Sequence, residues 1–151
     1  MLTFLLAWNP RRAAWRERSK LVETVQRQGH ATTSWGTNTK AIREGDQLYV
    51  IRLGVPPKGI FAFGTAISSS YKAPHWDLEK RQAGRECWMI DCDIQQIVDL
   101  KTGPFLDLAR LSNEVSDEIN WTPQGSGKLI PTNAASRLAD LWDLFYASRH
   151  I

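Results

Sequence analysis

The pattern of hydrophobic and polar positions predicts four strands. Leu2 to Trp8 is a continuous apolar run that ends at Asn9-Pro10, as in a buried strand stopped by a turn. Gln47 to Leu53 and Ile60 to Ile67 are rich in β-branched and aromatic residues and are joined by a Gly- and Pro-containing turn, so we expect an antiparallel hairpin. In Glu86 to Leu100, apolar residues alternate with acidic ones, which predicts a half-buried strand.

Helical spacing is found in three other stretches. From Ala13 to Gln28 the apolar residues form an irregular stripe, and Gly29 is a typical C-terminal stop. Phe105 to Leu111 predicts a short helix. After Thr132 or Asn133, either of which can cap a helix, apolar residues repeat at helical spacing to the end of the chain.

This order of elements, one strand, one helix, several strands with small helices and a final helix, predicts an α+β domain. Its strands form a small, mostly antiparallel β-barrel braced by helices. The chain of 151 residues is long enough to bury one core, so we expect residues 1–151 to be a single domain, with Trp142 in that core. Ser68 to Gly84 and Asn113 to Ile130 carry no regular pattern and are predicted as irregular connections.

Seven tryptophans are more than a chain of this length usually carries, and three of them lie among polar residues. Trp35 is surrounded by Ser, Thr, Asn and Gly, which predicts a loop rather than an apolar face. Trp76 and Trp121 have similarly polar neighbours. A large apolar side chain in a polar loop either covers the core or forms part of a binding site.

The charge of the chain is compatible with a polyanionic partner. The formal net charge is +3 and the sequence pI is about 9.0. Lys and Arg outnumber Glu between Arg11 and Arg27, and a second basic cluster falls in the connection before Glu86. Each cluster is either a solvated face or a set of phosphate contacts, and the sequence alone leaves both open.

The inventory of reactive residues gives no catalytic set, metal site or cofactor site. The three histidines are scattered, and no nucleophile elbow, phosphate-binding loop or dinucleotide fingerprint is present. Cys87 and Cys92 are predicted as buried thiols of a reduced cytoplasmic protein, and Asp91 and Asp93 as an exposed strand face. No apolar stretch is long enough for a membrane span, so we expect no membrane partner.

The residues themselves favour a nucleic-acid reader slightly over another ligand-binding domain. Binding a nucleobase requires stacking planes, a few polar groups for its edge and a cationic rim for phosphates, and this sequence supplies all three. An enzyme acting on an aromatic metabolite is a weaker alternative, because no acid/base set is found.

The order of several short motifs resembles that of the EVE-like domains of the PUA superfamily, which are related to the YTH readers. The resemblance covers nearly the whole chain. It is carried by Ala7-Trp8-Asn9-Pro10, Ser34-Trp35-Gly36, Glu44-Gly45-Asp46 before Leu48-Tyr49-Val50, Gly59-Ile60-Phe61-Ala62-Phe63-Gly64, and Trp121-Thr122-Pro123-Gln124-Gly125-Ser126-Gly127 before Leu141-Trp142.

The resemblance implies an aromatic cage for a modified base. Trp35 matches the cage tryptophan, and Trp76 is the expected opposing wall. Asn9, Ser34 and Ser126 match polar positions around the cage and are expected at the base edge. Trp121 is either a further wall or a packing residue of its motif. The phosphates of the nucleic acid would be held by Arg11, Arg12, Arg16, Lys72 and Arg81.

The function implied is recognition of a modified base in double-stranded DNA, which is flipped out of the duplex into the cage. The expected base is 5-methylcytosine or 5-hydroxymethylcytosine, with 6-methyladenine as a further option. EVE-like domains occur in modification-dependent restriction endonucleases of HNH or McrB type, so the chain would be a specificity module, with any cleavage supplied by a fused or partner nuclease. A PUA-like domain reading modified or single-stranded RNA is the alternative from the same resemblance, as is a small-molecule enzyme of the same superfamily.

Overall fold

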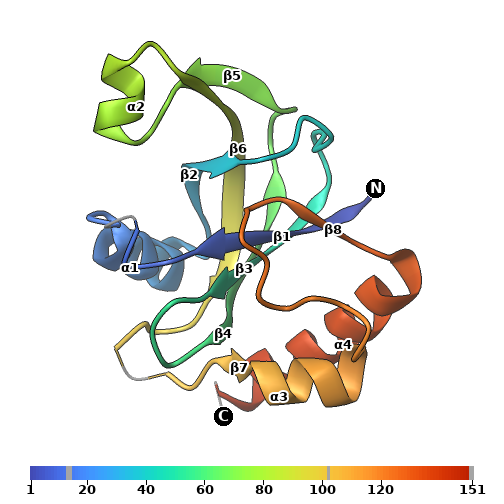
Figure 1. The fold of residues 1–151 in the computed structure, drawn as a ribbon. Coiled ribbons are helices and arrows are strands. Elements are labelled where there is room, and N and C mark those ends of the chain that lie inside the picture. Colours follow the sequence, from blue (N-terminus) through green and yellow to red (C-terminus); the bar gives the residue numbers. More distant parts are fainter. Residues whose placement is uncertain (13–14, 102, 150–151) are drawn as a thin grey trace.

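A computed structural model describes residues 1–12, 15–101 and 103–149, and it contains one mixed sheet flanked by helices (Figure 1). The strands are β1 (Thr3–Trp8), β2 (Ala31–Thr37), β3 (Gln47–Arg52), β4 (Gly59–Ala66), β5 (Tyr71–Pro74), β6 (Glu86–Ile97), β7 (Leu106–Asp107) and β8 (Lys128–Ile130). The helices are α1 (Arg18–Gln28), α2 (Leu78–Gln82), α3 (Leu108–Arg110), the π-helical turn η1 (Leu111–Val115) and α4 (Thr132–Ser148). The predicted α+β class is confirmed.

The sheet is mostly antiparallel, as predicted. Its strand order is β2-β6-β4-β3-β1-β8, with β5 paired to β6 and β7 paired to β4. β1 and β3 run parallel, starting from the pair Thr3 and Gln47, and the other strand pairs are antiparallel. The hairpin predicted from the two β-branched runs is confirmed as β3 and β4, with a register shift after Val50.

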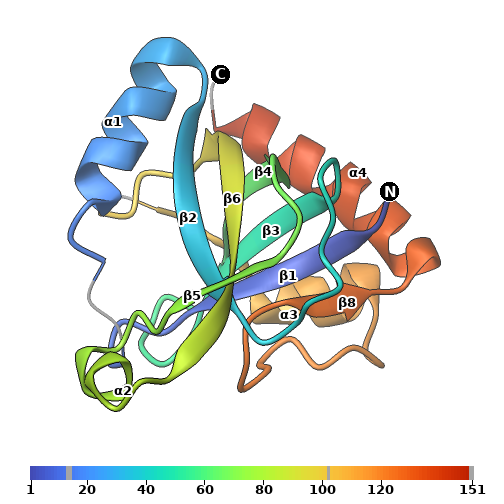
Figure 2. The same ribbon diagram turned by 90° about the horizontal axis from the view of Figure 1, so that it is seen from above.

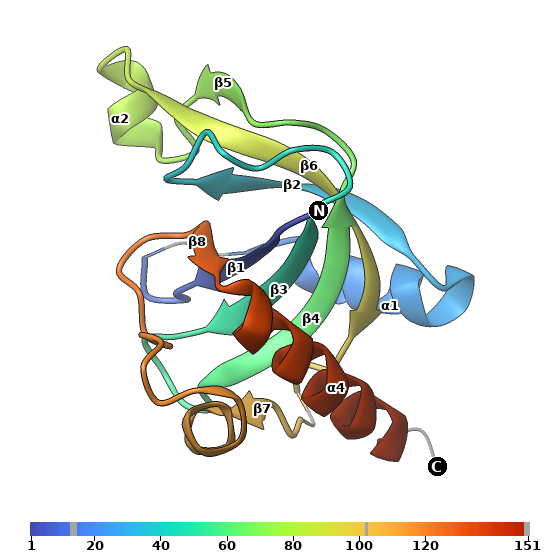
Figure 3. The same ribbon diagram turned by 90° about the vertical axis from the view of Figure 1, so that its right-hand side faces the viewer.

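The sheet curls so that its β2 and β6 end lies across from β1 (Figure 3), and a loop rather than a strand pair joins the two sides. Ser126 makes the connection: its Oγ accepts a hydrogen bond from the Ala7 N–H at 3.1 Å, and its carbonyl accepts one from the Asn38 N–H at 2.8 Å. The Gly127 N–H donates to the Leu5 carbonyl at 2.9 Å. The motif that ends in Ser126 therefore closes the barrel between β1 and the residue after β2.

The final helix covers the core, as its spacing predicts. Ala134, Leu138, Leu141, Trp142 and Phe145 of α4 are buried. Trp142 is fully buried, and its indole N–H donates to the Gln96 side-chain oxygen at 2.6 Å, so its predicted place in the core is confirmed. Burying Trp142 is favourable because its one polar atom has a partner.

The N-terminal helix lies where the apolar stripe predicts it, but it is shorter. Leu21, Val22 and Val25 of α1 are buried, and Gly29 ends the helix in the left-handed conformation with φ of 87°. The helix begins at Arg18, and Ala13 and Ala14, where the prediction began it, lie outside the described residues. Figure 2 shows α1 alongside β2 at one flank of the sheet.

Four predictions of local structure are wrong. The connection from Asn113 to Ile130 contains the end of η1 and strand β8, which pairs with β1. Trp35 lies in strand β2, opposite Ile90 of β6, rather than in a loop. The connection from Ser68 to Gly84 contains a strand and a helix, β5 and α2. The stretch predicted as one short helix begins with β7, because Leu106 pairs with Ile60 of β4 in the core. In each case pairing with a distant strand overrides local composition.

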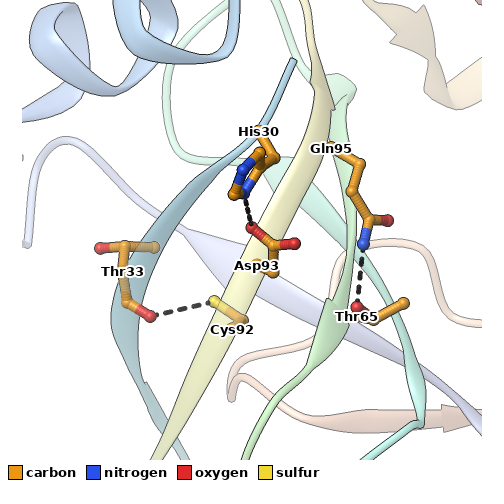
Figure 4. A network of polar contacts seen from close by, with 6 residues as sticks. All are labelled: His30, Thr33, Thr65, Cys92, Asp93 and Gln95. Atoms are coloured by element: carbon orange, nitrogen blue, oxygen red, sulfur yellow. Dashed lines mark hydrogen bonds and ion pairs between the residues drawn. The ribbon is translucent and has the colours of Figure 1, made fainter. Parts of the chain in front are cut away.

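Side chains reinforce the ladder of β2, β6 and β4 (Figure 4). His30 Nδ1 lies 2.9 Å from the Asp93 carboxylate, and Gln95 Nε2 donates to the Thr65 hydroxyl at 3.0 Å. The buried Cys92 thiol donates to the Thr33 carbonyl at 3.4 Å. Burial raises the pKa of Cys92 to about 12, so it remains a protonated thiol, as predicted. Cys87 differs from the prediction in being half-buried.

Candidate functional site

A cavity of about 670 Å³ opens where β1 and β2 end. Its walls come from the C-terminal ends of these strands, from the segment Thr122–Ser126 and from residues 71–85, which we call the arm and which comprise β5, α2 and the turns beside α2. This volume is within the range of small-molecule and cofactor pockets. The predicted base-binding residues Asn9, Ser34, Trp35, Trp76 and Ser126 all line it.

Trp35 is half-buried and is held by ring contacts from the core side. Its indole meets that of Trp15 edge to face, with ring centroids 5.0 Å apart and planes at 88°. Trp15 meets Trp8 in the same way at 5.3 Å. Trp15 also lines the cavity. The sequence places Trp15 only in the stripe of the first helix, so this wall of the cavity was missed. Edge-to-face pairs stabilise a defined ring orientation, so the Trp35 indole is held in place before any ligand binds.

Trp76 contributes from the arm and is 48% exposed. Its indole lies over the backbone of Gly36: a Cβ added there would be 2.9 Å from Trp76 Cδ1 and 3.2 Å from Nε1. Successive residues of a strand point to opposite faces, so the side chain of Trp35 and the ring of Trp76 approach the cavity from opposite faces of β2. Gly36 lets the Trp76 indole come this close to the strand, because the side chain of any larger residue at position 36 would occupy the place of the indole.

Asn9 is fixed at the end of β1 by a turn and by a glycine. Its Oδ1 accepts a hydrogen bond from the Arg11 N–H at 3.0 Å, and no bond to Nδ2 is formed within the described residues. The amide nitrogen can therefore donate to a ligand. The carboxamide lies against Gly54, whose φ is 84°, and a Cβ at Gly54 would overlap it.

We expect the substitution Gly54→Ala to displace Asn9 and to weaken ligand binding. The left-handed backbone costs a non-glycine residue about 1–2 kcal/mol, and the overlap with the Asn9 side chain adds to this loss. Thermal unfolding and affinity for the ligand would both be measured.

Gly45→Ala is the matched control for Gly54→Ala. Gly45 has φ of 93°, and nothing lies within 4 Å of the Cβ position there. Both variants carry the backbone strain, but Gly54→Ala alone meets Asn9. Equal effects of the two variants on ligand affinity would show that the position of Asn9 does not matter.

The hydroxyls of Ser34 and Ser126 offer a ligand opposite hydrogen-bonding roles, Ser34 as an acceptor and Ser126 as a donor. Ser34 Oγ donates to the Asp91 carboxylate at 2.8 Å, and the Tyr71 hydroxyl donates to the same oxygen at 2.6 Å. The bond to Asp91 raises the pKa of Tyr71. Because its proton is engaged, Ser34 can accept from a ligand. Ser126 Oγ accepts from the Ala7 N–H, so its own proton is available to donate.

The charge around the cavity is positive. Arg12, Lys58 and Lys80 line it, and the described lining residues include no Asp or Glu. Of the predicted phosphate contacts only Arg12 is among them, while Arg11, Arg16, Lys72 and Arg81 lie outside the lining. Lys72 lies over the ring of Trp88, 5.4 Å from its centroid. Lys58 and Lys80 were not predicted, because nothing local distinguishes them from other surface lysines.

His75 lines the cavity next to Trp76, with the two rings 5.1 Å apart. Its Nδ1 accepts a hydrogen bond from the Asp77 N–H at 3.0 Å. Partial burial lowers the pKa of His75, and the positive charge of Lys80 lowers it further. The ring is therefore neutral near pH 7, with its proton on Nε2, where it can donate. The sequence gave no signal for this residue beyond its place beside Trp76.

Trp121 does not line the cavity. It is 4% exposed, and its indole N–H donates to the Ser116 carbonyl at 2.9 Å, so it is placed in the core. Of the two predicted roles, this buried position fits packing within its motif and not a wall of the cavity. The residues that follow it, Thr122–Ser126, line the cavity instead.

Neither a metal centre nor a membrane span is found in the described part of the chain. Residues 1–12, 15–101 and 103–149 contain no group of three or more His, Cys, Asp or Glu side chains that could hold a metal ion. Among the same residues, no helix has the length and apolar character to cross a membrane.

Comparison with known proteins matches no family model and no curated protein sequence. Solved structures do match. A protein from Leishmania major superposes with a TM-score of 0.62 at 13% identity, covering 93% of this chain and 94% of that chain. A Pseudomonas syringae protein superposes with a TM-score of 0.59 at 15% identity, covering 92% and 98%.

These likenesses show the fold: over more than nine tenths of its length the chain shares the α+β fold of these solved structures. A further match is human THYN1, whose structure was solved in complex with DNA containing 5-methylcytosine. It superposes with a TM-score of 0.58 at 16% identity, covering 93% of this chain and 97% of THYN1.

Proposed function

We propose that this chain is a DNA-binding reader of a modified base, with 5-methylcytosine or 5-hydroxymethylcytosine as its target and 6-methyladenine as a further option. One observation carries the proposal: a single cavity combines four indoles, Trp35 and Trp76 among them, with polar edge groups and cations, and has no acidic side chain among its described lining residues. The shared fold of human THYN1, which was solved with DNA containing 5-methylcytosine, supports it.

The mechanism we propose is base flipping. Unstacking a base costs a few kcal/mol, and stacking it on an aromatic side chain is worth about 1–3 kcal/mol per base. In this proposal, stacking on Trp35 together with contact from Trp76, both of which line the cavity, would offset most of this cost. An extra methyl group that is buried adds about 0.8 kcal/mol, or roughly fourfold in affinity, which is enough to favour the modified base over the unmodified one.

Polar groups of the cavity would then read the base edge. Asn9 Nδ2, Ser126 Oγ and His75 Nε2 are donors, and Ser34 Oγ is an acceptor. A cytosine presents a ring nitrogen and a carbonyl as acceptors and an amino group as a donor. Three donors and one acceptor suit this edge, and so does the positive rim, since the flipped nucleotide keeps its phosphates.

The direct test is a binding panel of otherwise identical duplexes carrying 5-methylcytosine, 5-hydroxymethylcytosine, glucosylated 5-hydroxymethylcytosine, 6-methyladenine or no modification. We expect tighter binding of one modified cytosine than of the unmodified duplex. Equal affinity across the panel would contradict the proposal. Competition by RNA of the same sequence addresses the alternative, a PUA-like reader of RNA, which predicts that RNA displaces the DNA.

We expect the double substitution Lys58→Gln and Lys80→Gln to make DNA binding less dependent on salt. Each lost phosphate contact reduces the slope of log K against log salt by about 0.9, so the slope should fall by about 2. The preference for the modified base should change little, because phosphate contacts carry no base information. Titrations at several salt concentrations measure both quantities.

A matched control for the two lysines is the pair Lys20→Gln and Lys101→Gln. These residues carry the same charge but do not line the cavity. An equal reduction of the slope by the control pair would show that DNA senses only the net charge of the chain and not the rim of the cavity.

We further propose that the chain serves as the specificity module of a modification-dependent restriction system of HNH or McrB type. In this role it binds and discriminates, and a fused or partner nuclease cleaves. Co-expression with a nuclease of either type, followed by digestion of modified and unmodified plasmids, tests this role.

A further inference from the structure

The arm stands away from the rest of the barrel (Figures 1 and 2). It carries an exposed leucine close in sequence to residues that line the cavity. Leu78, the first residue of α2, is 56% exposed. Trp76 and Lys80, two residues before and after it, both line the cavity, whereas Leu78 does not. Its side chain therefore lies beside the opening rather than inside it.

Packing within this chain does not account for Leu78. None of the residues of α2 is buried, so the helix is not held by an apolar face. Polar bonds hold it instead: Asp77 Oδ1 accepts from the Lys80 N–H at 3.2 Å, and His75 Nδ1 accepts from the Asp77 N–H at 3.0 Å. The turn that presents Leu78 is thus fixed by hydrogen bonds while its apolar side chain is left in water.

The charge around Leu78 favours a polyanionic neighbour. Lys80 and Arg81 follow it within α2 and Arg85 follows in the next turn, against the acidic Asp77 and Glu79 on either side of it, so cations outnumber acids by three to two over residues 77–85. Asp77, the nearest preceding acid, is occupied as the helix cap. An exposed apolar side chain with cations two, three and seven residues further on resembles the combination with which proteins enter the base stack of DNA, where apolar wedges separate bases and cations hold the adjacent phosphates.

We propose that Leu78 fills the gap left in the duplex when the modified base enters the cavity, an inference that rests on the function proposed above. A flipped nucleotide remains attached to its backbone, so the gap lies at the mouth of the cavity. Leu78 is the exposed apolar side chain between two residues that line it. In the gap, Leu78 would contact the unpaired base of the opposite strand and the base pairs on either side. These contacts stabilise the state in which the modified base is flipped out.

The test compares one 5-methylcytosine oligonucleotide as a duplex and as a single strand, with the unmodified duplex alongside. Only the duplex has a gap to fill. We expect Leu78→Ala to weaken duplex binding about tenfold and single-strand binding less than about twofold, because a wedge acts only on stacked bases. A 2-aminopurine beside the methylated cytosine should brighten less on binding Leu78→Ala, since less of the complex holds the base extrahelical.

Two variants serve as controls for Leu78→Ala. Leu144→Ala removes a leucine that is 72% exposed on α4 and should leave duplex affinity unchanged. Leu78→Met keeps an apolar wedge and should retain duplex affinity. Thermal unfolding of each variant verifies that the fold is intact.

Each of the following outcomes would contradict the proposal that Leu78 fills the gap in the duplex. An equal loss on duplex and single strand would show that Leu78 contacts the strand generally. Unchanged duplex affinity would show that Leu78 meets a protein partner or nothing. If the unaltered chain does not prefer the methylated duplex over the unmodified duplex, the proposed function itself fails, and this result is distinct from the first two.

Discussion

Trp35→Ala is expected to abolish the preference for the modified duplex and to weaken binding of that duplex by about 5- to 150-fold, which corresponds to the loss of one stacking face worth about 1–3 kcal/mol. The Trp35 indole packs against Trp15 on its core side, with 5.0 Å between the ring centroids. Without it a flipped base gains too little to offset unstacking. Titration of modified and unmodified duplexes in parallel measures the effect.

Two further variants make this result specific to stacking. Trp35→Phe keeps an aromatic face and should retain part of the preference. Trp88→Ala removes a half-buried tryptophan of β6 that pairs with Thr37 but does not line the cavity, so the preference should persist. Discrimination that survives in Trp35→Ala would overturn the assignment of Trp35 to the base. Thermal unfolding distinguishes loss of the site from loss of the fold.

Elements whose signal is local were predicted correctly. β1 is a continuous apolar run because residues on both of its faces are buried, and α4 shows a stripe because one face covers the core. Gly29 ends α1 because its own backbone adopts a left-handed φ that other residues avoid. Such features need no knowledge of the partner strand.

β2 and the arm could not be predicted, because their structure depends on residues far away in the chain. Thr32, Thr33 and Ser34 have the composition of a loop, yet they form a strand because β6 pairs with them along its length. The Ser34 hydroxyl finds its acceptor in Asp91, 57 residues further on. β5 likewise exists through its pairing with β6. Hydroxyl side chains suit a strand when its neighbour supplies acceptors.

The cavity shows the same limit. The sequence predicted six of the residues that line it, Arg12 and five of the expected base contacts, but it could not indicate Trp15, His75 or Lys58, which the topology alone brings to the opening. Trp121 shows the converse: its polar neighbours in sequence left open a wall of the cavity or packing within its motif, and the ring is buried and bonded to the Ser116 carbonyl. Polar neighbours describe the backbone path, and they do not fix where one side chain points.

Trp142→Ala is expected to destabilise the chain by about 3–5 kcal/mol, the usual cost of removing a fully buried tryptophan. The loss combines the cavity left in the core with the unpaired Gln96 side-chain oxygen, which now accepts from the Trp142 indole at 2.6 Å. For a chain of this size, the melting temperature should fall by on the order of 10 °C. Thermal and urea unfolding measure it, and Trp142→Phe separates lost volume from the lost hydrogen bond.

The two tryptophan variants together separate the fold from the site. At a temperature where both remain folded, Trp142→Ala should keep the preference for the modified duplex, because Trp142 lies outside the cavity. Trp35→Ala should lose that preference with a smaller fall in melting temperature, because Trp35 is only half-buried. If stability and discrimination instead fell in proportion in both variants, the preference would reflect the integrity of the barrel rather than a dedicated aromatic wall.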